Sequence, residues 1–276
     1  MRQAASLLME VFRRLGACHV HTEPVPLLAW HDGPSSVELV APRRRKYESL
    51  QHVHTTAGTV TASLVEAGSG SEEELDQLGK RVKGAVVLVR GRVISGTKFT
   101  PLETRIQRVC NRGGAGVILP RMGPGGYPAV ELAGILQDIP APVLGVSAED
   151  GHELGIYAIM GHARVRLEAT GKSYHTTCVN KVAELGPGRG TTDIIVLGAH
   201  ADSFYVGPGA FDNLTGVVTV VDIARALAPF QCRFKRCLRL IVYTGEEFGF
   251  LGSRSYVERH KKELDRIRFV FNLDSL

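Results

Sequence analysis

One histidine and five acidic residues lie just after apolar runs, or beside a predicted helix start, in the last third of the sequence. They are His200, Asp202, Asp212, Glu246, Glu247 and Asp274. The apolar runs are DIIVLGA, RLIVYTG and RFVFNL. Imidazole nitrogen and carboxylate oxygen are the usual ligands of catalytic zinc, which keeps one position open for water. These residue types are therefore suited to a hydrolytic metal centre.

Each of these residues also has a simpler interpretation when it is taken alone. Asp212 could cap the helix that follows it, and Glu246 and Glu247 could begin a solvated helix. His200 could be a satisfied core histidine, and Asp274 a turn residue. Together, several acids and a histidine at neighbouring strand ends would repel and desolvate one another. A divalent cation would remove that conflict.

The surrounding pattern predicts that these strand ends lie together. From residue 168 onward, strands alternate with helices, which is typical of a parallel sheet with helices on both faces. Ligand sites in such sheets collect at the carboxyl ends of the strands. Residues 58–167 instead show short apolar strands, one helix and turns rich in Gly and Pro. We therefore predict an α/β fold made of residues 1–57 and 168–276, interrupted by a mainly β insert, 58–167.

The adjacent glutamates have a chemical logic of their own. A site with two metal ions needs a carboxylate that bridges them, and a hydrolase also needs a free carboxylate near the attacking water as general base. Successive residues point in different directions, so one glutamate could bind metal while the other handles protons.

Four motifs resemble the co-catalytic zinc exopeptidases, a family that includes bacterial di-zinc aminopeptidases and plasma glutamate carboxypeptidase. The motifs are GAHADS, GPGAFDNLTG, YTGEEFGFLGS and NLDS, in that order. The resemblance implies a two-zinc site in which His200 and Asp274 bind one ion and Glu247 binds the second. Asp212 would bridge both ions.

The same resemblance implies roles for the remaining residues. Glu246 would be the general base. Asp202 would orient His200 through the ring nitrogen that does not bind metal, as metal-bound histidines commonly require. Asn213 and Gly216 resemble helix-start and close-packing residues.

The resemblance extends to the insert and to the end of the chain. GAVVLVRG, NRGGAGVILP and IPAPVLGVSAEDGHEL within 58–167 resemble a protease-associated domain. The family's second zinc takes a further histidine from well beyond the last aspartate, whereas this sequence ends at Leu276. We therefore expect a truncated chain whose second zinc site lacks a ligand, and an incomplete site would impair hydrolysis.

The resemblance favours a zinc aminopeptidase that acts on peptides. A zinc carboxypeptidase of the same family and a non-catalytic pseudo-peptidase that binds peptides or partners are the alternatives. The sequence contains no G-x-S-x-G nucleophile elbow, which disfavours serine hydrolysis. Relatives of this kind are mostly exported, so an extracytoplasmic or secreted location is favoured, although the first residues resemble an amphipathic helix rather than a signal peptide.

Bulk composition excludes other classes of partner. The formal net charge of +5 is scattered except at Arg43–Lys46 and Arg259–Lys262, without the basic, aromatic-rich face of a nucleic-acid binder. No uninterrupted apolar run is long enough for a membrane span. The five cysteines lack C-x-x-C spacing, so they define neither a zinc finger nor a disulfide framework.

Overall fold

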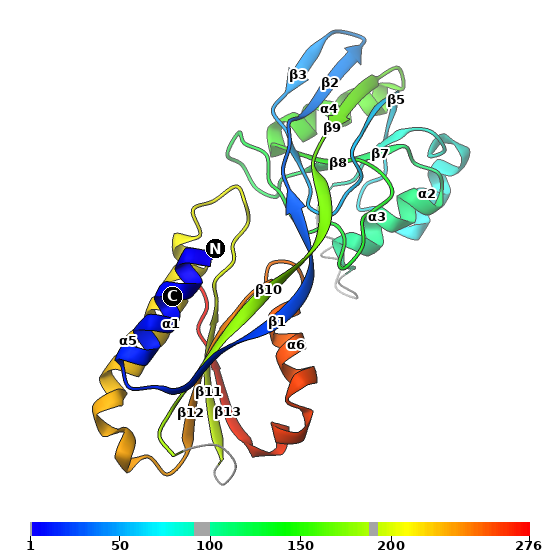
Figure 1. The fold of residues 1–276 in the computed structure, drawn as a ribbon. Helices are drawn as coiled ribbons and strands as arrows, with labels where there is room; N and C mark the ends of the chain where they lie inside the picture. The colour runs from blue at the N-terminus through cyan, green and yellow to red at the C-terminus, as the bar shows by residue number, and fades with distance from the viewer. Residues whose placement is uncertain (1, 91–99, 188–192) are drawn as a thin grey trace. The chain divides into compact units, whose positions relative to one another are not determined.

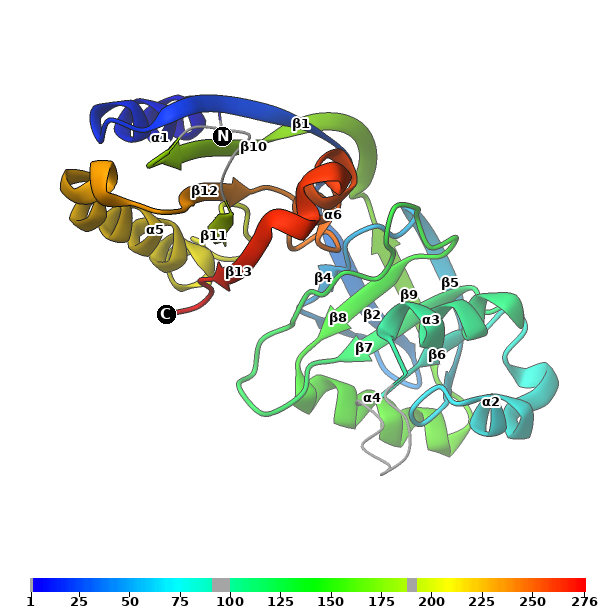
Figure 2. The ribbon, with the colours of Figure 1, turned by 90° about the horizontal axis from the view of Figure 1, so that it is seen from below.

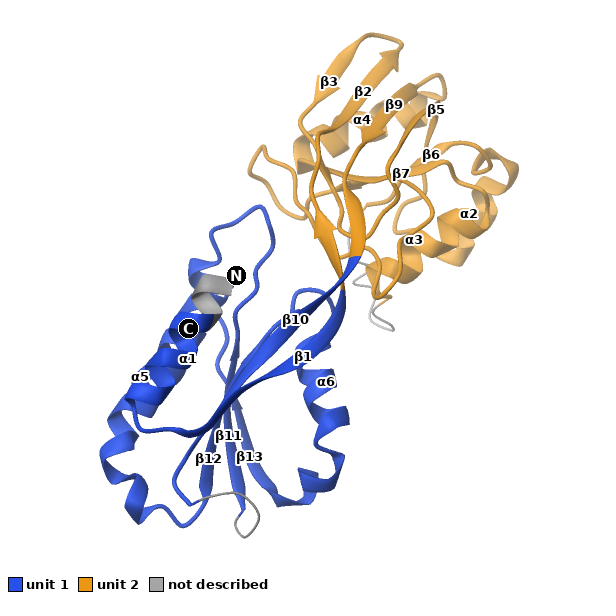
Figure 3. Ribbon diagram, in the orientation of Figure 1, with its two compact units in different colours: residues 1–27, 175–276 blue, residues 28–174 orange. Residues whose placement is uncertain are grey.

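The computed structural model describes residues 2–90, 100–187 and 193–276. The chain divides into two compact units, one formed by residues 1–27 and 175–276 and the other by 28–174 (Figure 3). The second unit begins well before the predicted boundary at residue 58. The reason is strand pairing: β2 (Ser35–Ala41) pairs with β9 (Arg164–Ala169), which makes it part of the insert's sheet.

The first unit is a five-stranded sheet with helices packed against it (Figure 1). Its strands lie in the order β1-β10-β12-β11-β13. Their bounds are β1 Cys18–His31, β10 Lys172–Leu185, β11 Ile194–His200, β12 Cys237–Tyr243 and β13 Ile267–Asn272. β11 is parallel to both β12 and β13, whereas β10 is antiparallel to β12. The predicted parallel sheet is therefore confirmed for the three strands that lead into the candidate site.

Helices cover both faces of this sheet, as predicted (Figure 2). The helices are α1 (Arg2–Arg14), α5 (Thr215–Leu227) and α6 (Leu251–Arg259). Alternate side chains of a strand point to opposite faces. On one face Ala183 packs in a cluster with Phe12 of α1 and Val220 of α5, while on the other Val182 packs in a cluster with Tyr256 of α6.

Short helical turns connect these elements: residues Ala210–Leu214 precede α5, Ala228–Arg233 follow it, and Lys261–Arg266 follow α6. The continuous stretch Ala210–Arg233 is long and apolar enough to cross a membrane by length and composition. Val220 and Ala224 within it are buried in the core cluster beside β11. A core helix passes the same test, so this stretch is weak evidence for a membrane protein.

The second unit has an eight-stranded sheet in the order β3-β2-β9-β5-β6-β7-β8-β4. Its further strands are β3 Arg45–Tyr47, β4 Leu50–Gln51, β5 Gly58–Glu66, β6 Val86–Leu88, β7 Gly116–Pro120 and β8 Val143–Val146. Its helices are α2 Glu72–Leu78, the 3-10 turn Gly79–Arg81, α3 Leu102–Asn111 and α4 Ala148–Met160. The one helix predicted in 58–167, within PLETRIQRVCNRGG, corresponds to α3.

Helices α2 and α4 were not predicted, although the sequence carries their start signals. Ser71 and Glu74 form a capping box at α2, and the Ser147 side chain accepts a hydrogen bond from the Asp150 N–H at α4. Such caps satisfy backbone N–H groups that a helix start leaves open, and the contact at α2 is reciprocal. The likeness of this unit to a protease-associated domain stays a prediction.

His52, which follows β4, is a buried histidine held in its neutral form. Its Nδ1 accepts a hydrogen bond from the Glu131 N–H at 3.0 Å, and only 2 % of the residue is exposed. Burial lowers its pKa from 6.5 to about 4, more than the backbone contact at Glu131 raises it. His52 must therefore take up a proton on unfolding in acid, but not in the native unit.

This shift predicts that the second unit loses stability as the pH falls from 6.5 to about 4. Above pH 6.5 His52 is neutral in both states, so the free energy of unfolding has its full value. Once the pH has fallen below the native pKa, proton linkage has lowered that free energy by about 3 kcal/mol. Trp30, the single tryptophan, lies in this unit, so its fluorescence can follow urea unfolding. His52→Asn should flatten this part of the profile, whereas the exposed-site control His162→Gln should not. Equal slopes in all three proteins would contradict the assignment.

Candidate metal centre

The strand ends of the first unit bring the predicted site residues to one edge of the sheet. His200 is the last residue of β11 and pairs in register with Tyr243, the last residue of β12. Gly198 of β11 pairs with Asn272, the last residue of β13. The loops that carry Glu246 and Asp274 therefore begin beside His200.

The Asn213 side chain ties the start of α5 to the end of β13. Its amide nitrogen donates to the Leu273 carbonyl at 2.9 Å, and its oxygen accepts from the N–H groups of Gly216 and Ser275. A Cβ on Gly216 would lie 2.3 Å from both the Asn213 amide oxygen and the Leu273 carbonyl oxygen, so only glycine fits. Both residues therefore do what the sequence indicated, helix start and close packing, and they hold Asp212 near Asp274.

Asp212 does not cap α5. The residue before that helix is Leu214, which forms no side-chain cap, and the backbone of Asp212 is non-helical. The Asp212 carboxylate instead approaches His200, with 3.2 Å between Oδ1 and Nε2, and is 54 % exposed.

Three carboxylates surround the buried ring nitrogen of His200. Nε2 lies 3.2 Å from Asp212 Oδ1, 3.4 Å from Asp274 Oδ1 and 3.9 Å from Glu246 Oε2. The candidate ligand atoms of His200, Glu246 and Asp274 all lie within 4.8 Å of one another. We call His200, Asp212, Glu246 and Asp274 the His200 cluster. Glu246, the expected general base, is the farthest of the three carboxylates from Nε2, but its oxygen still lies within the group of candidate ligand atoms.

Asp202 supports the cluster from behind, but not as expected. The His200 Nδ1 lies 3.0 Å from the Asp202 backbone carbonyl and 3.9 Å from the carboxylate. Nδ1 must donate to a carbonyl, which leaves Nε2 of a neutral imidazole with its lone pair toward the carboxylates. The Asp202 carboxylate instead accepts the Glu247 N–H at 3.1 Å, fixing the backbone of the glutamate loop.

Electrostatic strain pervades the cluster. Burial, together with the charges of Asp212 and Glu246, raises the pKa of Glu247 to about 7. Burial and neighbouring carboxylates also raise the pKa of Glu246 against the opposing effect of His200. Burial lowers the pKa of His200, but the charges of Glu246, Asp202 and Asp274 outweigh it and leave the pKa raised. The raised pKa values show that Glu246, Glu247 and His200 are each stabilised by a proton, and a bound cation would stabilise the cluster in the same way.

The donor set fits a divalent metal ion. Among the residues that the structure describes, the buried His200 Nε2 has no hydrogen-bond partner despite the nearby carboxylates. An imidazole lone pair facing several carboxylate oxygens, with Asp212 open to solvent, matches the nitrogen and oxygen ligands of catalytic zinc. His200, Asp212, Asp274 and one of the two glutamates would hold the ion.

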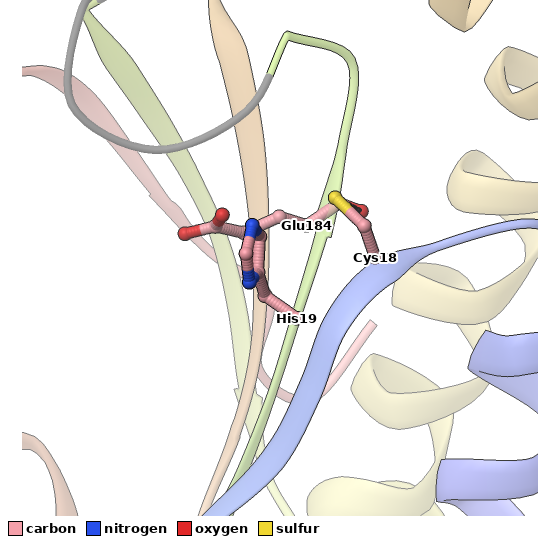
Figure 4. Close-up of side chains that lie close together, drawn as sticks. All are labelled: Cys18, His19 and Glu184. Carbon is pink, nitrogen blue, oxygen red and sulfur yellow. Dashed lines mark hydrogen bonds between the residues drawn. The ribbon is translucent and has the colours of Figure 1, made fainter.

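A second group of metal-ligand types, Cys18, His19 and Glu184, was not foreseen from the sequence (Figure 4). It lies where β1 runs beside β10. The Glu184 carboxylate is buried against Arg239, with 2.7 Å between Oε1 and the guanidinium, and the Cys18 thiol donates to the Glu184 carbonyl. A carboxylate already neutralised by a buried arginine is a poor metal ligand, so we interpret this group as structural.

The segment of the chain that carries the His200 cluster matches a known family. Residues 180–276, which include the whole cluster, match the family model described as Peptidase family M28. The cluster therefore lies within the part of the chain that is similar to that family.

Curated relatives carry exopeptidase names. A probable leucine aminopeptidase 2 of Aspergillus oryzae is 36% identical over 135 residues, 49% of this chain and 27% of the relative. Carboxypeptidase Q of Mus musculus is 25% identical over 286 residues, 100% of this chain and 60% of the relative. The chain thus spans less than two thirds of the length of these relatives.

Solved structures share the fold. The aminopeptidase from Aneurinibacillus sp. strain AM-1 is 23% identical, with a TM-score of 0.81 over 99% of this chain and 64% of that chain. A zinc aminopeptidase from Bacillus subtilis is also 23% identical, with a TM-score of 0.71 over 99% of this chain and 62% of that chain. These similarities confirm the predicted α/β fold.

The geometry predicts that zinc stabilises the chelator-treated protein through His200. Binding to the native state alone contributes about 2.7 kcal/mol at a free zinc concentration of 100 times Kd, so scanning calorimetry should show a higher unfolding temperature. His200→Ala should abolish this gain, whereas His175→Ala, an exposed site in the same unit, should keep it. An unchanged zinc effect in His200→Ala would refute the cluster as the metal site.

Proposed function

We propose that this chain is the metal-binding part of a zinc metallo-exopeptidase, most simply an aminopeptidase that releases the N-terminal residue of a peptide. The observation that carries the proposal is the buried His200 Nε2, which has no hydrogen-bond partner among the described residues and faces three carboxylates. The aminopeptidase names of relatives support it.

The side chains divide the work of hydrolysis between them. Zinc, when bound, would polarise the scissile carbonyl and lower the pKa of water toward about 7. Glu246 accepts the proton of the attacking water and returns it to the leaving amine, a role suited to a carboxyl whose pKa is raised by burial. Asp212, whose side chain is more exposed than those of Glu246 and Asp274, would be the carboxylate available to a second ion. Asp202 holds both His200 and the Glu247 backbone in place.

Glu246→Gln should lower kcat by about 10²–10⁴-fold, the usual contribution of a positioned general base, while zinc content stays unchanged. The assay is release of leucine from a leucyl peptide by the zinc-loaded protein, with Glu258→Gln, an exposed site, as the matched control. Full activity in Glu246→Gln would show that another group is the base. Loss of zinc together with activity would instead make Glu246 a ligand.

Carboxypeptidase action is the second candidate, because the similarity to mouse carboxypeptidase Q extends over the whole chain. Peptides that are chemically blocked at one end distinguish aminopeptidase from carboxypeptidase activity. An aminopeptidase cleaves a peptide with a free N-terminus and an amidated C-terminus, and a carboxypeptidase cleaves one with an acetylated N-terminus. Cleavage of neither by the zinc-loaded protein would favour the non-catalytic alternative.

A further inference from the structure

A cavity of about 350 Å³ lies beside the His200 cluster within the first unit. Its apolar wall comes from α1 and the start of α5. The apolar side chains of that wall are Leu7, Leu8, Val11, Leu214 and Val217. We call this cavity the α1 pocket. Its volume lies in the range of pockets that enclose small molecules.

Two opposite charges line the α1 pocket without pairing with each other. Lys181 of β10 and Asp202 both border it. Only 9 % of the Lys181 residue is exposed, and only 9 % of the Asp202 side chain. Within the described part of the chain, no ion pair shorter than 4.0 Å involves Lys181. Burial leaves the pKa of Lys181 below its usual value, although the charges of Cys178 and Asp202 act in the opposite direction. The charge of Asp202 therefore acts on Lys181, and both residues line the same pocket.

One oxygen of the Asp202 carboxylate can still accept a hydrogen bond. Oδ2 accepts the Glu247 N–H, but the buried Oδ1 has no hydrogen-bond partner in the part of the chain that the structure describes. His200 does not need that oxygen, because it contacts the Asp202 carbonyl instead. An unpartnered buried carboxylate oxygen is costly unless a donor reaches it.

We propose that the α1 pocket binds a free apolar α-amino acid. The ammonium group of the ligand donates to Asp202 Oδ1, its carboxylate pairs with the Lys181 ammonium, and its side chain lies against the leucine and valine wall. Only a ligand with both charges and an apolar body satisfies the two buried groups and the wall together. An amine alone leaves Lys181 unpaired, and a carboxylate alone leaves Asp202 unpaired.

This site differs from the His200 cluster, since neither His200, Glu246 nor Asp274 lines the pocket. The inference goes beyond the proposed function and does not require hydrolysis. An apolar amino acid is, however, the product that the proposed exopeptidase would release, so the pocket would hold the product next to the reacting centre.

The test is calorimetric titration of chelator-treated protein with three related ligands. L-leucine carries both charges, L-leucinamide lacks the carboxylate, and 4-methylpentanoate lacks the amine. Leucine should bind at least about 10-fold more tightly than either analogue, a ratio that corresponds to about 1.4 kcal/mol. Equal affinities for all three, or no binding of leucine at millimolar concentration, would overturn the proposal.

Variants then place the ligand in the molecule. Lys181→Met keeps an unbranched apolar side chain in the buried position and should reduce leucine affinity to that of leucinamide while leaving leucinamide affinity unchanged. Lys262→Met, at an exposed position, is the matched control. His200→Ala should retain leucine binding, because that binding needs no metal. Loss of binding in His200→Ala, or binding only with zinc, would assign the ligand to the metal centre and refute the α1 pocket.

If Lys181→Met does not fold, as judged by its unfolding transition, the comparison of leucine with leucinamide in the unaltered protein still decides the proposal. Failure of peptide hydrolysis would not affect the result, since the titration is made without metal. The pocket and the proposed enzyme activity can therefore fail independently.

Discussion

The first unit is organised around a buried imidazole nitrogen that faces several carboxylates at one edge of a sheet. Carboxylates crowded near His200 repel one another, and partial burial strengthens that repulsion. The raised pKa values of Glu246, Glu247 and His200 all express the same need for positive charge. A folded chain can maintain this arrangement only if the rest of the unit holds the groups in place, and a bound cation would repay the cost.

That support comes from short, well-connected elements. β11 and β12 end on paired residues, and β13 ends opposite Gly198 of β11, so the loops after the three strands begin at the same edge. Asn213 then joins the start of α5 to the end of β13 through three hydrogen bonds, and the backbone of Asp202 fixes the tautomer of His200. Asp202 also lines the neighbouring α1 pocket. Its Oδ2 accepts the Glu247 N–H of the glutamate loop, and we propose that its Oδ1 binds the ligand in the pocket.

Much of this arrangement could be predicted, because buried parallel strands are recognisable in the sequence as apolar runs, and here polar residues follow each run. The strand-helix alternation after residue 168 predicted β11, β12 and β13, and residue types predicted their shared ligand chemistry. Other features were missed where pairing is distant in sequence. β2 joins β9 across more than a hundred residues of chain, so the insert began earlier than composition indicated. Helix α4 was missed although Ser147 offers a cap at its start.

The sequence by itself determined which residues could bind a metal, the strands they follow and the class of chemistry they suit, since these depend on residue type and local periodicity. Tertiary structure alone decided how they meet. It placed Glu246 among the possible ligands and gave His200 a contact to the Asp202 carbonyl rather than to its carboxylate. It also placed Lys181 and Asp202 in the lining of one cavity. Those outcomes depend on distances between segments far apart in the chain, and short-range patterns do not encode such distances.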